Sequence, residues 1–167
     1  SYLPDAYKSS LASIKITVLG SLSIFEAARI ASPSSAILFI GSSKEYNSNI
    51  NATVITEDIH PLPENFYGIT KYSAELFGQQ YVRQFGMKIS FTRSFNHTGP
   101  GQSPLFVCSD WAKQIVNIER GLSEPVLLTG SLESTIDFTD VRDVVDGYYR
   151  ILKYGKAGEV YNVCSGR

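Results

Sequence analysis

A short apolar segment that ends in two serines constrains the fold of this chain more than any other feature. Residues 36–40 are all apolar, and Gly41 separates them from Ser42 and Ser43. A run of this length, bounded by glycine and serine, predicts a buried strand. In open α/β sheets, ligands bind where such strands end. Ser42 and Ser43 therefore mark a candidate site.

The second candidate feature is a tyrosine followed four residues later by a lysine, Tyr67 and Lys71. The segment 66–85 has helical periodicity, so both side chains lie on one face of a helix. A tyrosine hydroxyl titrates near pH ~10, and a nearby ammonium lowers that pKa. Such a pair can exchange a proton with a substrate hydroxyl or carbonyl. The spacing alone is a weak indication, because most such pairs lie on exposed helix faces.

The rest of the chain alternates helical and strand-like segments. Apolar residues at helical spacing cover 11–31, where Gly20 is expected to permit close packing. Gly86 is a suitable C-cap for the helix 66–85, and Asp140 a suitable N-cap for a later helix. Further strands are predicted at 88–92, 125–129, 135–140 and 159–163, and further helices at 104–121 and 141–154.

A long polar loop is predicted at 46–63. Loops of this length inside a compact domain are unusual unless they are functional, so we expect this one to cover a bound ligand. Glu57 lies within it. We expect its carboxylate to bond to the backbone and to take no part in catalysis.

Composition excludes several functional classes. The 167 residues suffice for one domain, with 43% hydrophobic and 19% charged residues and a net charge of -1. The chain lacks the basic patch of a nucleic-acid-binding protein. Two distant cysteines support neither a disulfide framework nor a zinc site, and no other metal site is expected. No apolar run approaches the ~20 residues that span a bilayer, so a cytoplasmic protein is expected.

Three segments resemble the extended short-chain dehydrogenases/reductases that act on nucleotide sugars, the NAD-dependent epimerase/dehydratase family. They are the run SSKEY from Ser42, the pair Tyr67 and Lys71, and the run RSFNHTGPGQ from Arg93. The last run most resembles the branch that reduces GDP-4-keto-6-deoxy-hexoses. The resemblance covers nearly the whole chain and implies an α/β fold, a Rossmann-like doubly wound parallel sheet with part of a smaller α/β substrate domain.

The resemblance also implies a domain division and a missing motif. Residues 1–103 would be the C-terminal portion of an NAD(P)-binding Rossmann domain, and 104–167 a partial substrate-binding region interleaved with its sheet. The family binds the cofactor pyrophosphate with a G-x-x-G-x-x-G loop, which these residues lack. The chain is therefore expected to be a fragment without this motif and without the C-terminal end of the family. The isolated chain should be inactive and bind NAD(P) weakly.

The activity implied by the resemblance is hydride transfer from NADPH or NADH to a 4-keto nucleotide sugar. Tyr67 would protonate the forming alkoxide, Lys71 would lower the Tyr67 pKa and bond the nicotinamide ribose, and Ser42 would hold the carbonyl oxygen. Further residues are implied to contact ligands: Gly41, Tyr67, Lys71, Phe95 and His97 the cofactor, and Ser43, Asn96 and Lys113 the substrate. For His97 a structural hydrogen bond is an equally good interpretation.

Other activities of the family remain open. A 4-epimerase shares the serine, tyrosine and lysine. A 4,6-dehydratase needs a further acid, which its members place at the position of Lys44; the adjacent Glu45 is expected to point the opposite way. A non-catalytic binding relative is compatible with Thr17 and Ile136, which replace a family asparagine and a family arginine.

The family also forms dimers through a bundle of helices. By analogy, we expect a homodimer through the helices 11–31 and 66–85.

Overall fold

The computed structural model describes residues 9–47, 50 and 54–166. Residues 48, 49 and 51–53 of the predicted loop lie outside the described residues. The described residues of that loop contain no helix or strand. A short 3-10 turn, η2 (Ser43–Glu45), immediately precedes the loop.

The first helix confirms the prediction for 11–31 but departs from it in detail. It consists of α2 (Ser10–Ser13), a π-helical segment η1 (Ile14–Leu19) and α3 (Gly20–Ala31). The junctions have right-handed helical dihedral angles, so the three pieces run on as one helix. The expectation of close packing at Gly20 is wrong: a Cβ there would meet the Lys15 carbonyl oxygen at an ordinary 3.9 Å.

A parallel three-stranded sheet forms the centre of the first unit. Its strands are β1 (Ala36–Ile40), β2 (Lys88–Ser94) and β5 (Val160–Val163), in the order β1-β2-β5. All three confirm predicted strands, and β2 continues two residues beyond the predicted end. β2 lies in the middle and is buried from its second residue onward, as parallel strands covered on both faces are.

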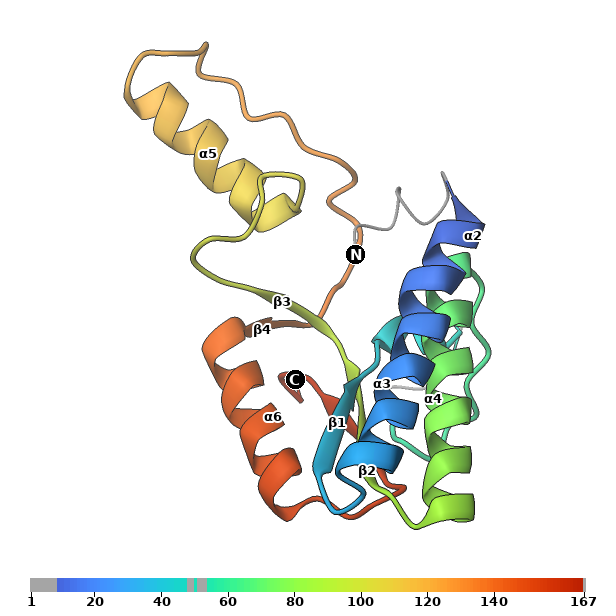
Figure 1. Ribbon diagram of the computed structural model, residues 1–167. Helices are drawn as coiled ribbons and strands as arrows, with labels where there is room; N and C mark the ends of the chain where they lie inside the picture. Colours follow the sequence, from blue (N-terminus) through green and yellow to red (C-terminus); the bar gives the residue numbers. More distant parts are fainter. Residues whose placement is uncertain (1–8, 48–49, 51–53, 167) are drawn as a thin grey trace. The chain divides into compact units, whose positions relative to one another are not determined.

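Helices cover both faces of this sheet (Figure 1). α3 and α4 (Phe66–Phe85) lie on one side, and α6 (Val141–Tyr154) lies on the other. α4 and α6 have the predicted bounds, and Gly86 ends α4 with a φ of 64°, in the left-handed conformation that glycine favours. Asp140 caps α6, because its carboxylate accepts the Arg142 N–H at 2.8 Å.

The core joins these helices to the sheet. A Cβ on Gly78 of α4 would lie 2.6 Å from the Phe91 ring and 3.2 Å from the Phe25 ring. The close helix approach expected at Gly20 therefore occurs at Gly78 instead. The buried hydrophobic cluster consists of Phe25, Phe39, Ala74, Met87, Ile89 and Phe91.

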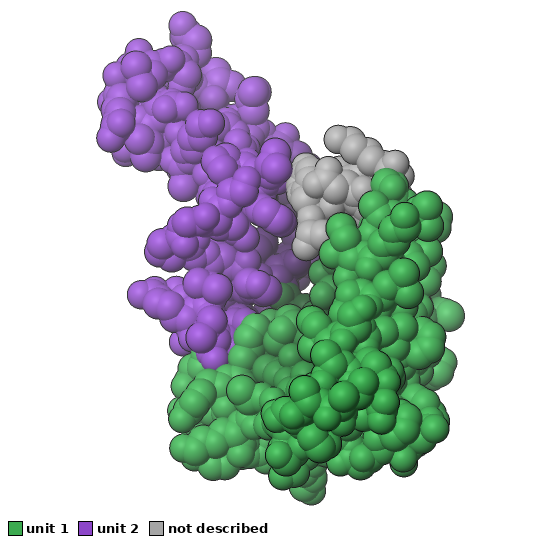
Figure 2. Space-filling model, in the orientation of Figure 1, with its two compact units in different colours: residues 1–95, 146–163 green, residues 96–145, 164–167 purple. Residues whose placement is uncertain are grey.

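The second unit, residues 96–145 and 164–167, is distinguished by colour in Figure 2. It contains a parallel pair, β3 (Asn96–Thr98) and β4 (Phe138–Asp140), and the helix α5 (Val107–Glu119). α5 and β4 are shorter than the predicted 104–121 and 135–140. The predicted domain boundary at 103/104 stays a prediction.

The predicted strand at 125–129 is wrong. Its residues pair with no strand in the described part of the chain. Instead, the Gln114 amide contacts Leu128: the Leu128 N–H donates to Oε1 at 2.8 Å, and Nε2 donates to the Leu128 carbonyl at 3.1 Å. A helical side chain thus supplies the two hydrogen bonds that a neighbouring strand would have made.

Among the described residues, one helix is long and apolar enough to cross a membrane by length and composition. It spans Ser10–Ala31, with a mean hydropathy of 1.5, and 11% of the apolar window is buried. This helix is a single weak exception to the expectation that no run reaches this length. Core helices of soluble proteins pass the same test, so the finding is a weak indication of a membrane segment.

Candidate active site

A tight turn follows β1 and fixes Ser42. The Gly41 N–H donates to the Thr92 carbonyl at 2.8 Å and ends the strand pairing. Ser42 then caps η2: its Oγ accepts the Lys44 N–H at 3.2 Å, and Glu45 Oε1 accepts the Ser42 N–H at 2.8 Å. This reciprocal pair is a capping box, which satisfies two otherwise unpaired N–H donors. Both the main chain and the hydroxyl of Ser42 are therefore held.

The first turn of α4 packs directly on this serine turn. Asn65 caps the helix by accepting the Gly68 N–H at 2.9 Å. A Cβ on Gly68 would collide with the main-chain carbonyl of Lys44. Glycine permits this approach, which brings Tyr67 next to Ser42.

Tyr67 and Lys71 lie on the same face of α4, as their spacing predicts. The Lys71 Nζ lies 5.9 Å from the Tyr67 ring centroid and 5.6 Å from the Phe39 ring centroid. The same Nζ donates to the Ile40 carbonyl at 2.8 Å. Lys71 is therefore fixed at the carboxyl end of β1, where it also lines a hollow of about 240 Å³ between α3 and β1.

Burial governs the protonation of both groups. It raises the pKa of Tyr67, while a hydrogen bond with the Ser42 side chain lowers it in part. Burial lowers the pKa of Lys71, and the carboxyl group of Glu45 opposes that shift. The direction for the Tyr67 pKa is the reverse of the one expected from the neighbouring ammonium, because the loss of water on burial outweighs the hydrogen bond with Ser42.

A buried charged cluster beneath the site has no counterpart in the sequence analysis. Arg93 donates to both carboxylate oxygens of Glu75, at 2.7 and 3.2 Å, and to the Tyr46 hydroxyl at 3.1 Å. Glu45 lies beside the pair, with 3.5 Å between its Oε2 and Arg93 Nε. An arginine within a predicted strand was the available signal, since such a charge is rarely buried without a partner.

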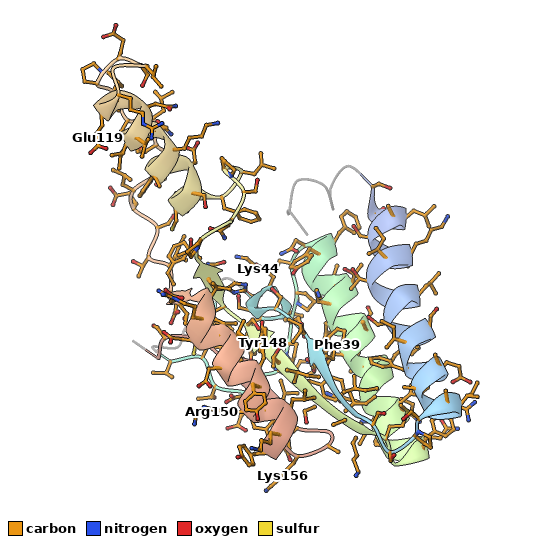
Figure 3. The ribbon with its side chains drawn as sticks, turned by 60° about the vertical axis from the view of Figure 1, so that its left-hand side comes forward. Phe39, Lys44, Glu119, Tyr148, Arg150 and Lys156 are labelled. Carbon is orange, nitrogen blue, oxygen red and sulfur yellow. The ribbon has the colours of Figure 1, made fainter. Side chains whose placement is uncertain are left out.

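The interpretation of Glu45 needs a correction. The residue was expected to point away from the site because adjacent residues of an extended segment alternate, but Ser43–Glu45 is a 3-10 turn. Because alternation does not apply in such a turn, the Glu45 carboxyl group is directed into the protein, where it is fully buried and bonds to the Ser42 N–H. Lys44, beside it, is exposed (labelled in Figure 3).

The predicted site residues divide between the two units. The first unit holds six of them, namely Gly41, Ser42, Ser43, Tyr67, Lys71 and Phe95. The second unit holds Asn96, His97 and Lys113. In the first unit, the Phe95 N–H donates to the Val163 carbonyl at 2.8 Å. In the second, Asn96 and His97 lie in β3, and the His97 carbonyl accepts the Gln102 amide at 3.1 Å.

Lys113 lines a cavity of about 550 Å³ within the second unit. The other lining residues are Asp110, Gln114, Asn117, Ser123, Val126, Leu128 and Thr129. Most of the lining side chains are polar, and the apolar ones, Val126 and Leu128, are exposed.

Two further residues bear on earlier expectations. Glu57 accepts the main-chain N–H of Asn162 at 2.7 Å, which confirms its backbone role.

Tyr148 of α6 (labelled in Figure 3) lies with its hydroxyl oxygen 2.6 Å from Ser94 Oγ at the carboxyl end of β2. Tyr148 also raises the pKa of Tyr67 and is thus a neighbour of the candidate acid that no sequence pattern indicates.

The parallel sheet, with helices on both faces and polar side chains at the strand ends, defines an α/β protein of the Rossmann type. More particularly, the chain belongs to the NAD dependent epimerase/dehydratase family, whose model matches residues 1–164.

Known relatives place it within that family. The GDP-6-deoxy-D-mannose reductase of Pseudomonas aeruginosa is 36% identical over 99% of this chain and 55% of its own length. The structure of RMD from Pseudomonas aeruginosa complexed with NADPH matches with a TM-score of 0.95, at 36% identity, over 99% of this chain and 56% of that one. The UDP-glucose 4-epimerase of Thermotoga maritima with UDP-glucose matches with a TM-score of 0.87 at 27% identity, over all of this chain and 53% of that one. The chain thus spans about half the length of these relatives.

Proposed function

We propose that the natural gene product containing this chain is an NAD(P)-dependent nucleotide-sugar oxidoreductase that reduces the 4-keto group of a GDP-4-keto-6-deoxy-hexose. The observation that carries the proposal is the junction of Ser42, Tyr67 and Lys71 at the carboxyl end of β1. The 36% identity to a GDP-6-deoxy-D-mannose reductase supports the choice of substrate.

Each of the three residues has a role that its contacts allow. The Tyr67 phenol, with its raised pKa, holds its proton at neutral pH and can deliver it to an oxygen that gains charge. Ser42 Oγ is held by the Lys44 N–H and can donate its own proton to the same oxygen. A reduced nicotinamide cofactor, when bound, supplies the hydride.

The donors of Lys71 fit such a cofactor. An ammonium has three N–H donors, and the Ile40 carbonyl takes one of them. The other two can bind ribose hydroxyls, which are neutral acceptors. NADPH or NADH is therefore the proposed cofactor; the relative that matches with a TM-score of 0.95 is complexed with NADPH. Further proposed cofactor contacts are Gly41, Phe95 and His97, and proposed substrate contacts are Ser43, Asn96 and Lys113.

Replacing Tyr67 with phenylalanine tests the proposal. In the natural gene product, Tyr67→Phe should lower kcat for a GDP-4-keto-6-deoxy-hexose by about 10²–10⁴-fold, as loss of a general acid does. Tyr81→Phe is the matched control, because Tyr81 lies on the same helix and bonds to Glu26 at 3.0 Å. Unchanged turnover in Tyr67→Phe would refute the proposed role.

Cofactor stoichiometry separates the alternatives. A reductase consumes one reduced cofactor for each sugar, whereas a 4-epimerase or 4,6-dehydratase returns the hydride and shows no net oxidation. The buried Glu45 argues against a dehydratase, because its carboxyl group bonds to the Ser42 N–H inside the protein. The 27% identity to a UDP-glucose 4-epimerase supports the 4-epimerase as the remaining alternative activity. A non-catalytic relative would turn over no sugar and would retain its partner after Tyr67→Phe.

Homodimerisation and a cytoplasmic location complete the proposal. Apolar side chains are exposed along both helices that we propose as the dimer interface, among them Ile16, Ile24, Ile69 and Phe77. A second copy would remove this surface from water. The substitution Ile24→Glu places a charge in this surface and should then yield monomers in sedimentation experiments. A dimer that persists when further charges are introduced along both helices would contradict the proposed interface.

A further inference from the structure

Two buried carboxyl groups share one guanidinium next to Ser42. Glu45 and Glu75 are both 0% exposed, and Arg93 is 4% exposed. Arg93 donates two hydrogen bonds to Glu75, whereas Glu45 has only the 3.5 Å approach of its Oε2 to Arg93 Nε. A bidentate pair is the stronger ionic contact. Arg93 therefore neutralises Glu75 first, and Glu45 lacks a full counter-charge.

The two oxygens of Glu45 differ in their surroundings. Oε1 accepts the main-chain N–H of Ser42 at 2.8 Å. Oε2 is buried and has no hydrogen-bond partner within the described part of the chain. An ionised oxygen in that position is costly. A proton on Oε2 removes the charge and makes this oxygen a donor toward the Glu75 carboxylate.

We propose that Glu45 is a positioning residue for the reaction, whose neutral carboxyl group shares a proton with Glu75 and so fixes the Ser42 turn against the helix that carries Tyr67. One oxygen holds the Ser42 main chain, and the other lies 3.5 Å from Arg93, the guanidinium that binds Glu75 of α4. The proposal rests on the proposed function only in that Ser42 and Tyr67 act on the substrate.

The surrounding groups support a neutral Glu45. Burial and the neighbouring Glu75 raise the pKa of Glu45 to about 9, while the Ser42 N–H and Arg93 act to lower it. Titratable groups face Glu45 from each element around it: Tyr67, Lys71, Tyr72 and Glu75 from α4, Arg93 from β2, and Tyr46 from the turn itself.

The kcat values of two substitutions at Glu45, made in the natural gene product, test whether the carboxyl group acts in its neutral form. Glu45→Gln keeps an acceptor for the Ser42 N–H and a donor toward Glu75, so kcat should stay close to that of the wild type. Glu45→Leu keeps the size and loses both contacts; kcat should fall by up to about 10²-fold with a smaller change in KM, as misplacement of a reacting group does. Glu26→Gln, which alters a carboxylate of α3 paired with Arg29, is the control.

The pH dependence of stability tests the shared proton without any turnover. An acid with a raised pKa in the folded state binds its proton on folding, so wild-type stability falls as pH rises from about 4.3, the value in the unfolded chain, toward the folded value of about 9. Glu45→Gln has no such proton. The free energy of unfolding of Glu45→Gln, measured in urea and compared with the wild type, should increase steadily across this window, whereas Glu26→Gln should run parallel to the wild type.

Two results would overturn the inference: a difference between Glu45→Gln and the wild type that stays flat with pH, or a loss of kcat in Glu45→Gln as large as in Glu45→Leu. Neither result bears on the proposed function, which is tested separately by the turnover of Tyr67→Phe and by the cofactor stoichiometry. If Glu45→Leu does not fold, the urea comparison of Glu45→Gln still decides the question.

Discussion

Gly68 of α4 lies directly against the main-chain carbonyl of Lys44, which leaves no room for a Cβ at this position. A backbone contact therefore sets the distance between the serine turn and the helix that carries Tyr67. Backbone contacts of this kind tolerate little adjustment, because neither partner can rotate away.

Gly68→Ala should separate the two elements. The added methyl group should lower the free energy of unfolding by about 1–3 kcal/mol, the usual cost of overpacking. Gly20→Ala is the matched control, since Gly20 is also helical but has space for a Cβ, and it should raise stability by about 0.5–1 kcal/mol. Urea unfolding of both variants measures the contrast, and equal stability of Gly68→Ala and wild type would contradict the contact.

Removing the buried guanidinium should destabilise the protein strongly. Arg93→Met leaves the fully buried Glu75 without its counter-charge, which should cost about 3–5 kcal/mol. Arg150→Met breaks an exposed pair with Asp146 and should have little effect on stability, because water and salt screen such pairs. The two losses, compared by thermal and urea unfolding, should differ several-fold; similar losses would show that Glu75 does not depend on Arg93.

Lys71→Met should affect turnover far more than stability. The variant loses the hydrogen bond to Ile40 but also the cost of burying an ammonium, so the net change at neutral pH should be within about 1 kcal/mol. Burial lowers the pKa of Lys71 in the folded state, so the unfolded chain binds the proton more tightly. Wild-type stability should therefore rise relative to Lys71→Met as pH increases from the folded pKa toward about 10.4. An opposite slope in urea unfolding would exclude a buried ammonium.

The isolated chain should gain little thermal stability from NADPH or NADH. Its sequence has no glycine-rich strand-to-helix loop to bind the pyrophosphate, and ligand stabilisation scales with affinity. A thermal shift measured at saturating cofactor should be absent for these 167 residues. A rise in Tm of several degrees would show that the described residues bind the cofactor without such a loop.

Local signals in the sequence predict part of the fold well. The apolar run of β1 and the helical periodicity of α4 are properties of adjacent residues, and Gly86 ends α4 where its left-handed conformation is needed. The shared face of Tyr67 and Lys71 follows from the same periodicity.

Contacts between distant segments account for the errors. Val126 and its neighbours have strand propensity, but a strand also needs a partner, and here Gln114 takes that place. Gly20 and Gly78 look alike within their helices, and only the Phe91 and Phe25 rings packed against Gly78 distinguish them. The inward direction of Glu45 depends on a 3-10 turn that alternation does not predict.

The arrangement of β2 between β1 and β5 also governs the order in which this unit can assemble during synthesis. β1 and β2 can pair once β2 has left the ribosome, but β5 follows only after residues 96–145 of the second unit have been translated. Until then, one edge of β2 exposes unpaired N–H and C=O groups, as a template for other chains. The nascent chain should therefore depend on chaperones most during translation of residues 96–159.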